Sequence, residues 1–175
     1  MNNAIKSRLV RNLVPAAIFA VAATAGTGLA CADDSVNTGY FGGVAIMGYD
    51  TVAYFTDGKA VKGSEEFSTD WLGTPWHFAT KKHQQMFVSD PVKYAPQYGG
   101  YCAAEVAGSG SVTVNVDPEA FKIIDGKLYL IYDAGNANSF AEGASDLVRT
   151  GDINWPIVKA ELEVDQPNWK LINAQ

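Results

Sequence analysis

Three side chains in the central part of the chain could act together as metal ligands. Cys102, His83 and Met86 offer a thiolate, an imidazole and a thioether, and His77 offers a second imidazole. Soft ligands of this kind suit Cu(I), and a thiolate with an imidazole also suits Zn(II). Because His83 and Met86 are three residues apart, they would share one face of a helix. The alternative is structural, with Cys102 and Met86 in the core and His83 on the surface.

Catalysis by a Cys102 thiolate is a second chemical option. It would need a base, which His83 or His77 could supply, and an orienting carboxylate from Asp50 or Asp90. The sequence has no motif for an oxyanion hole, a phosphate-binding loop or a dinucleotide fold. Both aspartates also suit turns and helix caps. The sequence therefore favours a protein that is not an enzyme.

Tyrosines gather around the segment that leads to the cysteine. Tyr98 and Tyr101 come directly before it, and Tyr49 lies closer to the N-terminus. Tyrosine has a large apolar ring and a hydroxyl that needs a hydrogen-bond partner. Together with Trp71 and Trp76, these rings could line a ligand cleft or a protein interface. They could equally form the core of a small domain that has no disulfide.

A segment rich in proline and glycine, residues 90–103, must position these side chains. Asp90 and Pro91 suit the N-cap and the first position of a single helical turn. The pair Gly99–Gly100 permits positive φ or a close approach of another chain segment. We expect Cys102 to enter a strand over residues 102–106.

The remaining pattern predicts an α+β fold, a small and mostly antiparallel sheet with short helices packed on it. No internal repeat is apparent. The expected elements are strands at 51–55, 60–61 and 111–116, hairpins at 67–71 with 75–78 and at 121–124 with 127–132, a helix at 81–89 capped by Thr80, one helical turn after Asp117-Pro118, and helices from about Asn138 and from Trp155-Pro156.

The first 32 residues have the composition of a secretory signal peptide. A basic start is followed by an apolar run and by small residues at the predicted cleavage site after Ala32. A lipid anchor on Cys31, which would become the new N-terminus, is the alternative. We expect a flexible leader over residues 33–42 and a single domain over residues 43–175, exported to the periplasm.

Removal of residues 1–32 would leave ten basic and nineteen acidic side chains, a net charge of −9, with Cys102 as the remaining cysteine. A lone cysteine excludes an intramolecular disulfide. A strongly acidic chain is a poor partner for nucleic acid. No segment after the signal peptide is long and apolar enough to be a transmembrane helix.

Several motifs resemble the small exported proteins of the YHS-domain family. They are Gly48-Tyr49-Asp50-x-Val52-Ala53-Tyr54-Phe55, Asp90-Pro91-x-x-Tyr94-x-Pro96-Gln97-Tyr98-Gly99-Gly100-Tyr101-Cys102-Ala103, Asp125-Gly126-Lys127-Leu128-Tyr129-Leu130 and Asn154-Trp155-Pro156. The resemblance spans about residues 46–156. It implies a YHS-like fold and a suspected role in metal binding, since the wider family includes segments of heavy-metal transport ATPases. Thr51 departs from it, because the family usually has proline there.

Two hypotheses follow. The first is a non-enzymatic protein that binds or handles a soft metal ion, copper or zinc, through Cys102, His83 and Met86. The second is a metal-free module that binds a protein or a small ligand through the tyrosines Tyr49, Tyr98 and Tyr101.

Overall fold

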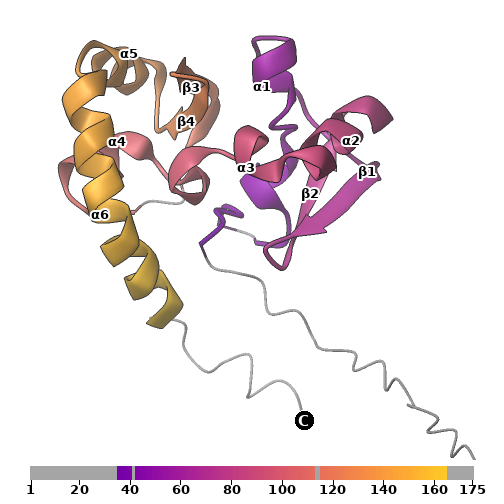
Figure 1. Ribbon diagram of the computed structural model, residues 1–175, viewed down its shortest axis with the longest axis horizontal. Helices are drawn as coiled ribbons and strands as arrows, with labels where there is room; N and C mark the ends of the chain where they lie inside the picture. Colours follow the sequence, from indigo (N-terminus) through magenta and orange to yellow (C-terminus); the bar gives the residue numbers. More distant parts are fainter. Residues whose placement is uncertain (1–34, 41, 113–114, 165–175) are drawn as a thin grey trace, which may run out of the picture.

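The computed structural model of the protein describes residues 35–40, 42–112 and 115–164. The predicted signal peptide and its Cys31 lie outside this part of the chain. Two small antiparallel sheets of two strands each are surrounded by helices (Figure 1). The α+β class expected from the sequence is therefore confirmed.

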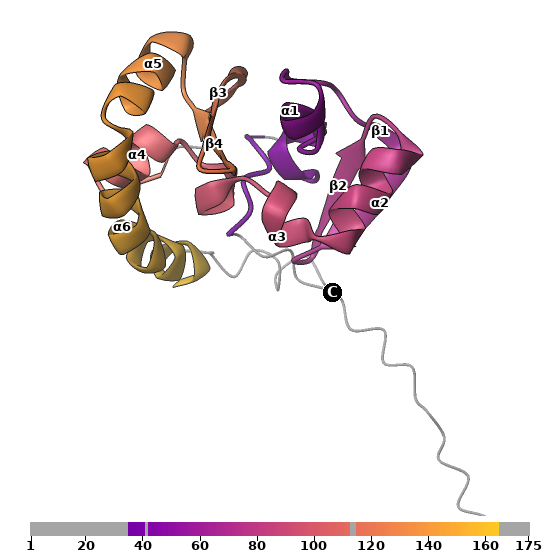
Figure 2. The same cartoon turned by 45° about the horizontal axis from the view of Figure 1, so that its top comes forward.

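The described chain builds two halves with the same order of elements, which lie side by side with α3 near their junction (Figures 1 and 2). The first half comprises the turn η1 (Ala45–Gly48), α1 (Ala53–Thr56), β1 (Ser64–Trp71), β2 (Thr74–Phe78), α2 (Lys81–Ser89) and α3 (Pro91–Tyr94). The second half comprises η2 (Gln97–Gly100), α4 (Ala103–Gly108), β3 (Asp117–Ile124), β4 (Lys127–Ile131), α5 (Ala134–Glu142) and α6 (Ala144–Val164).

The hairpin and first following helix of the second half repeat those of the first with a constant offset of 53 residues. The start of β1 at Ser64 corresponds to the start of β3 at Asp117, and each later boundary through the end of α2 follows the same offset. In both hairpins the pairing is interrupted by a bulge at the same place, after Ser64 and after Asp117. The structure therefore contains a repeat of elements where no internal repeat is apparent in the sequence.

Local interactions are repeated as well. The Thr80 side chain caps α2 by accepting from the backbone of His83, and Asp133 caps α5 by accepting from the backbone of Asn136. Each helix then inserts one fully buried phenylalanine against the aromatic residue of its own hairpin. The ring centroids of Trp76 and Phe87 are 4.9 Å apart, and those of Tyr129 and Phe140 are 5.5 Å apart. Each half thus has its own buried aromatic pair, with one ring from the hairpin and one from the helix.

Each half opens with a left-handed turn. In η2, Tyr98, Gly99 and Gly100 have φ of 53°, 61° and 82°, and in η1, Ile46 and Met47 have φ of 50° and 53°. The positive φ predicted for the glycine pair is confirmed. Non-glycine residues in this region of backbone space are strained, so both turns must be held in place by the packing around them.

The close approach predicted at the glycine pair is also confirmed, and its partner is the N-terminal segment. A Cβ added at Gly99 would overlap the Ser35 carbonyl oxygen. Asn37 donates from its backbone to the Gly99 carbonyl at 2.8 Å and from its side chain to the Gly100 carbonyl at 3.0 Å. Residues 35–37 are buried by these contacts, which differs from the flexible leader expected there. A polar, glycine-rich composition does not reveal a backbone that pairs with a distant turn.

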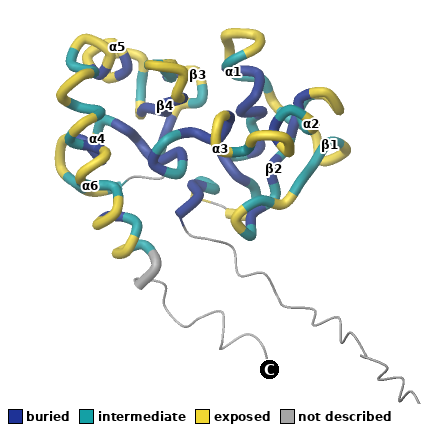
Figure 3. The backbone as a smooth tube through the Cα atoms, viewed as in Figure 1, coloured by how far each residue is buried: buried dark blue, intermediate teal, exposed yellow. Residues whose placement is uncertain are grey.

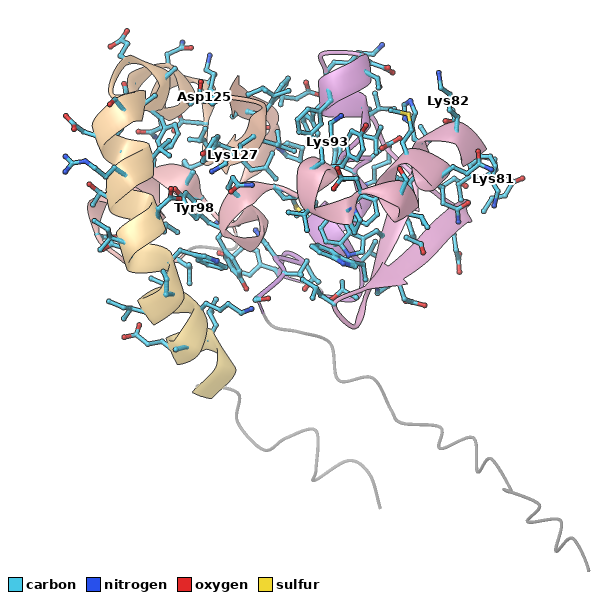
Figure 4. The ribbon with its side chains drawn as sticks, in the orientation of Figure 1. Lys81, Lys82, Lys93, Tyr98, Asp125 and Lys127 are labelled. Carbon is cyan, nitrogen blue, oxygen red and sulfur yellow. The ribbon has the colours of Figure 1, made fainter. Side chains whose placement is uncertain are left out.

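The core runs continuously through both halves, and Figure 3 shows the buried backbone along β2, β4 and the segment between α3 and α4. α2 presents Phe87 to this core and keeps Lys81 and Lys82 in solvent (Figure 4). The largest fully buried side chains are Trp76, Tyr54, Tyr129, Phe78, Phe87 and Phe140.

Other expected elements differ from the structure. The strand predicted at 102–106 is the helix α4, because an alanine-rich stretch favours helix over strand. The strand predicted at 51–55 is largely the short helix α1, which follows a turn anchored by Asp50. Asp117-Pro118 opens strand β3 and no helical turn, and Trp155-Pro156 lies inside α6 and does not begin it. Two hairpins, α2, α3 and the helical character of the C-terminal part are as predicted.

Candidate functional site

The three predicted soft ligands lie in different surroundings. Cys102 is 1 % exposed and lies in the apolar core at the start of α4. Among the described residues, its thiol forms no hydrogen bond or ion pair with His83. His83 and the half-buried Met86 lie on α2, in the other half (Figure 1). His77 is half-buried on β2. The described part of the chain contains no cluster of three or more His, Cys, Asp or Glu residues suited to a metal ion.

His83 is instead held by a buried carboxylate. Its Nδ1 lies 2.6 Å from Asp50 Oδ2, and its Nε2 lies 3.3 Å from the Thr56 hydroxyl. Asp50 is fully buried, and its two oxygens also accept from the backbone of Val52, Ala53 and Ala79. The surface position expected for His83 in the structural alternative is wrong, because Asp50 draws the ring inward to join α1, the end of β2 and α2.

Tyr98 joins the left-handed turn η2 to α6. Its hydroxyl lies 3.1 Å from the Val148 carbonyl and 3.0 Å from Asp152 Oδ1, and its ring contacts Trp155 (Figure 4). Burial first, and then the negative charge of Asp152, raise the pKa of the Tyr98 hydroxyl above its ordinary value. The Tyr98 side chain is therefore neutral, and its hydrogen bonds hold it in a fixed position.

A pocket of about 350 Å³ lies next to this tyrosine, where the two halves meet. Aromatic side chains line it on two sides, and α6 adds one acidic and one basic side chain. The first half contributes Trp71, Leu72, Trp76 and Val92; the connection between the halves contributes Ala95 and Pro96; the second half contributes Gln97, Tyr98 and Gly99 from η2 and Asp152, Trp155 and Lys159 from α6; and the N-terminal segment contributes Ser35 and Val36.

Three polar groups in the pocket lining form no hydrogen bond within the residues that the structure describes, and none of them is a fully enclosed atom, so solvent reaches them. They are the indole N–H groups of Trp71 and Trp155 and the side-chain amide of the half-buried Gln97. The neighbouring indole of Trp76, by contrast, donates to the Trp71 carbonyl at 3.1 Å. Polar groups in a concave, largely apolar site are what fix the orientation of a bound molecule.

The tyrosines predicted as ligand contacts divide into two groups. Tyr98 lines the pocket, and Tyr101 lies behind it with its ring centroid 6.2 Å from that of Trp155. Tyr49 lies elsewhere, with the Lys62 ammonium 4.4 Å from its ring centroid. The sequence does not predict Asp152 and Trp155 as site residues, because no local sequence signal indicates that α6 packs against the turn at Tyr98.

Comparison of the chain with family models, with curated proteins and with solved structures gives no match. The resemblance to the YHS-domain family therefore stays a prediction. In the described ranges, no helix has the length and apolar character needed to cross a membrane.

Proposed function

We propose that this protein is a binding module that holds a small organic molecule in the pocket between its two halves. The observation that supports this proposal is a cavity of about 350 Å³, within the usual range for ligand sites, lined by indole rings and by polar groups with no internal partner. An apolar lining with a few convergent polar groups is the usual chemistry of such sites.

The backbone around the pocket supports the same proposal. Tyr98 and Leu72 both line it, and both have positive φ, 53° and 52°. A side chain beyond glycine costs about 1–2 kcal/mol in this conformation. Strain of this kind is common at ligand sites, where the surrounding structure holds residues in a fixed position before the ligand arrives.

Metal handling at Cys102, His83 and Met86 is the competing proposal, and it rests on the YHS resemblance. The contacts favour it less, because Cys102 is enclosed by the core and His83 already bonds Asp50 and Thr56. Anaerobic titration with Cu(I) and Zn(II) in the presence of a competing chelator tests it. Tight one-to-one binding that disappears in Cys102→Ser would establish the metal site.

Ligand-observed NMR with a mixture of small neutral, cationic and anionic ring compounds tests the pocket proposal. At least one compound should bind the wild-type chain and lose most of its signal change with Trp155→Ala. Tyr132→Ala is the matched control, because Tyr132 is 52 % exposed and does not line the pocket. Absence of binding, or binding that Trp155→Ala leaves unchanged, would contradict the proposal.

A further inference from the structure

One face of α6 presents an acid, an aromatic ring and a base to the pocket. Asp152, Trp155 and Lys159 all line it, and their spacing of three and then four residues places them on one side of the helix. At a rise of about 1.5 Å per residue, the acid and the base are about 10 Å apart along the axis. Asp152 and Lys159 carry opposite charges, so the lining has no excess charge that would select a cationic or an anionic ligand over an uncharged one.

The polar groups of the lining suit a ligand rich in oxygen. The indole N–H groups of Trp71 and Trp155 can only donate, whereas the Gln97 amide can donate and accept. Asp152 has already accepted the Tyr98 hydroxyl at Oδ1, and its carboxylate can accept further hydrogen bonds. Hydroxyl groups satisfy all of these partners, because one oxygen can both donate and accept.

The tryptophans add a requirement for a flat apolar surface on the same molecule. Trp71 belongs to the first half and Trp155 to the second, so indoles bound the pocket from both halves. Trp71 is supported by edge contacts with Trp76 and Phe87, and Trp155 by contacts with Tyr98 and Tyr101. Indole rings fixed in this way suit a ring-shaped ligand whose faces are apolar and whose edge carries the polar groups.

We infer that the pocket binds an uncharged, polyhydroxylated ring, a ligand of the saccharide class. This inference rests on the proposed function and names the chemistry of its ligand. Sugar rings combine apolar C–H faces with a rim of hydroxyl groups, which match the indoles, the Gln97 amide and the Asp152 carboxylate. The exposed Leu72 and Val92, at 41 % and 74 %, border the pocket on the first half.

Calorimetric titration of the full mature chain tests the inference with glucose, N-acetylglucosamine and their β-1,4-linked dimers. Glucosamine, at a pH where its amine is protonated, and glucuronic acid serve as charged analogues. We expect a neutral sugar to bind at least about tenfold more tightly than either analogue. Trp155→Ala and Gln97→Ala should each weaken this binding about tenfold or more, and Tyr132→Ala should leave it unchanged.

Two results would overturn the inference. One is no saturable binding of any neutral sugar in the panel, and the other is tighter binding of a charged analogue. If ring compounds in the NMR mixture still bind in a manner that depends on Trp155, the pocket proposal stands and the saccharide assignment alone fails. If neither experiment shows such binding, both fail.

Discussion

Leu72 and Asp125 occupy the same place in two equivalent hairpin turns, with φ of 52° and 50°, and each is followed by a glycine with positive φ. Aspartate and asparagine tolerate this conformation, which is why Asp-Gly is a preferred sequence for a two-residue hairpin turn. Leucine does not share this tolerance. Because the repeat shows that the turn itself works with aspartate, the strained leucine at the pocket rim is a position at which the proposed binding role can be tested.

Replacing Leu72 with asparagine should stabilise the protein by about 1 kcal/mol, because the turn geometry is kept and the backbone strain is reduced. Urea unfolding of wild type and variant measures the difference. Ligand affinity for the pocket should fall at the same time, since an apolar wall residue is lost.

The reciprocal substitution supplies the control for this prediction. Asp125→Leu places the strained residue in the second hairpin, outside the pocket lining, and should cost about 1 kcal/mol with no change in ligand affinity. A stabilising Asp125→Leu, or a destabilising Leu72→Asn, would show that the two turns are not energetically equivalent.

Gly99 provides a second test, of the contact with the N-terminal segment. In Gly99→Ala the new methyl group would overlap the Ser35 carbonyl, so the segment must move away or the turn must change. We expect a loss of several kcal/mol in the free energy of unfolding, because both backbone strain and steric overlap act. Limited proteolysis should then cleave near residues 35–40 faster than in the wild type.

Gly58→Ala separates the effect of backbone strain from that of steric overlap. Gly58 has φ of 66°, close to the 61° of Gly99, but a Cβ there would meet nothing within 4 Å. This variant should therefore lose only about 1 kcal/mol and keep its N-terminal segment protected. Equal losses in the two variants would mean that the contact with Ser35 contributes nothing.

Asp50 should be far more important for stability than other aspartates. Asp50→Ala would leave three backbone N–H groups and the His83 ring without their buried acceptor, which we expect to cost about 3–5 kcal/mol. Asp57→Ala, at an exposed position that accepts from the Thr56 hydroxyl, should stay within about 0.5 kcal/mol of wild type. Thermal unfolding of both variants tests this, and similar midpoints would contradict it.

The sequence was informative wherever local chemistry decides the structure. Thr80 and Asp90 mark the starts of α2 and α3, and the Gly99–Gly100 pair marks the left-handed turn and the close approach, all as predicted. These features depend on a few neighbouring residues whose backbone preferences are strong. The α+β class follows from the same signals.

The repeat and the pocket could not be found in this way. Within the hairpin and its helix, the corresponding positions agree only at Glu66 and Glu119, Gly73 and Gly126, and Phe87 and Phe140. A buried position accepts any apolar residue of similar size, so Trp76 and Tyr129 can have equivalent places without sequence identity. The meeting of Tyr98 with Asp152 depends on how α6 packs, which no local pattern encodes.

Alkaline pH should destabilise the protein through its buried tyrosines. Burial first, and then the charges of Asp152 and Asp125, raise the pKa of Tyr129 to about 12, and burial likewise raises the pKa values of Tyr54 and Tyr98. The folded state therefore favours the neutral phenol, whereas the unfolded chain ionises near pH 10. The stabilisation is fully present below about pH 10 and is lost as the pH rises through about 12.

Urea unfolding at a series of pH values, followed by tyrosinate absorbance, measures this effect. Above about pH 10 the free energy of unfolding should fall with pH, by up to about 1.4 kcal/mol per pH unit for each tyrosine that stays neutral only when folded. Tyr129→Phe should make the fall less steep, because unfolding of this variant releases one proton fewer at high pH. A free energy of unfolding that stays constant to pH 12, or a Tyr129→Phe profile as steep as that of the wild type, would show that this hydroxyl is not protected by folding.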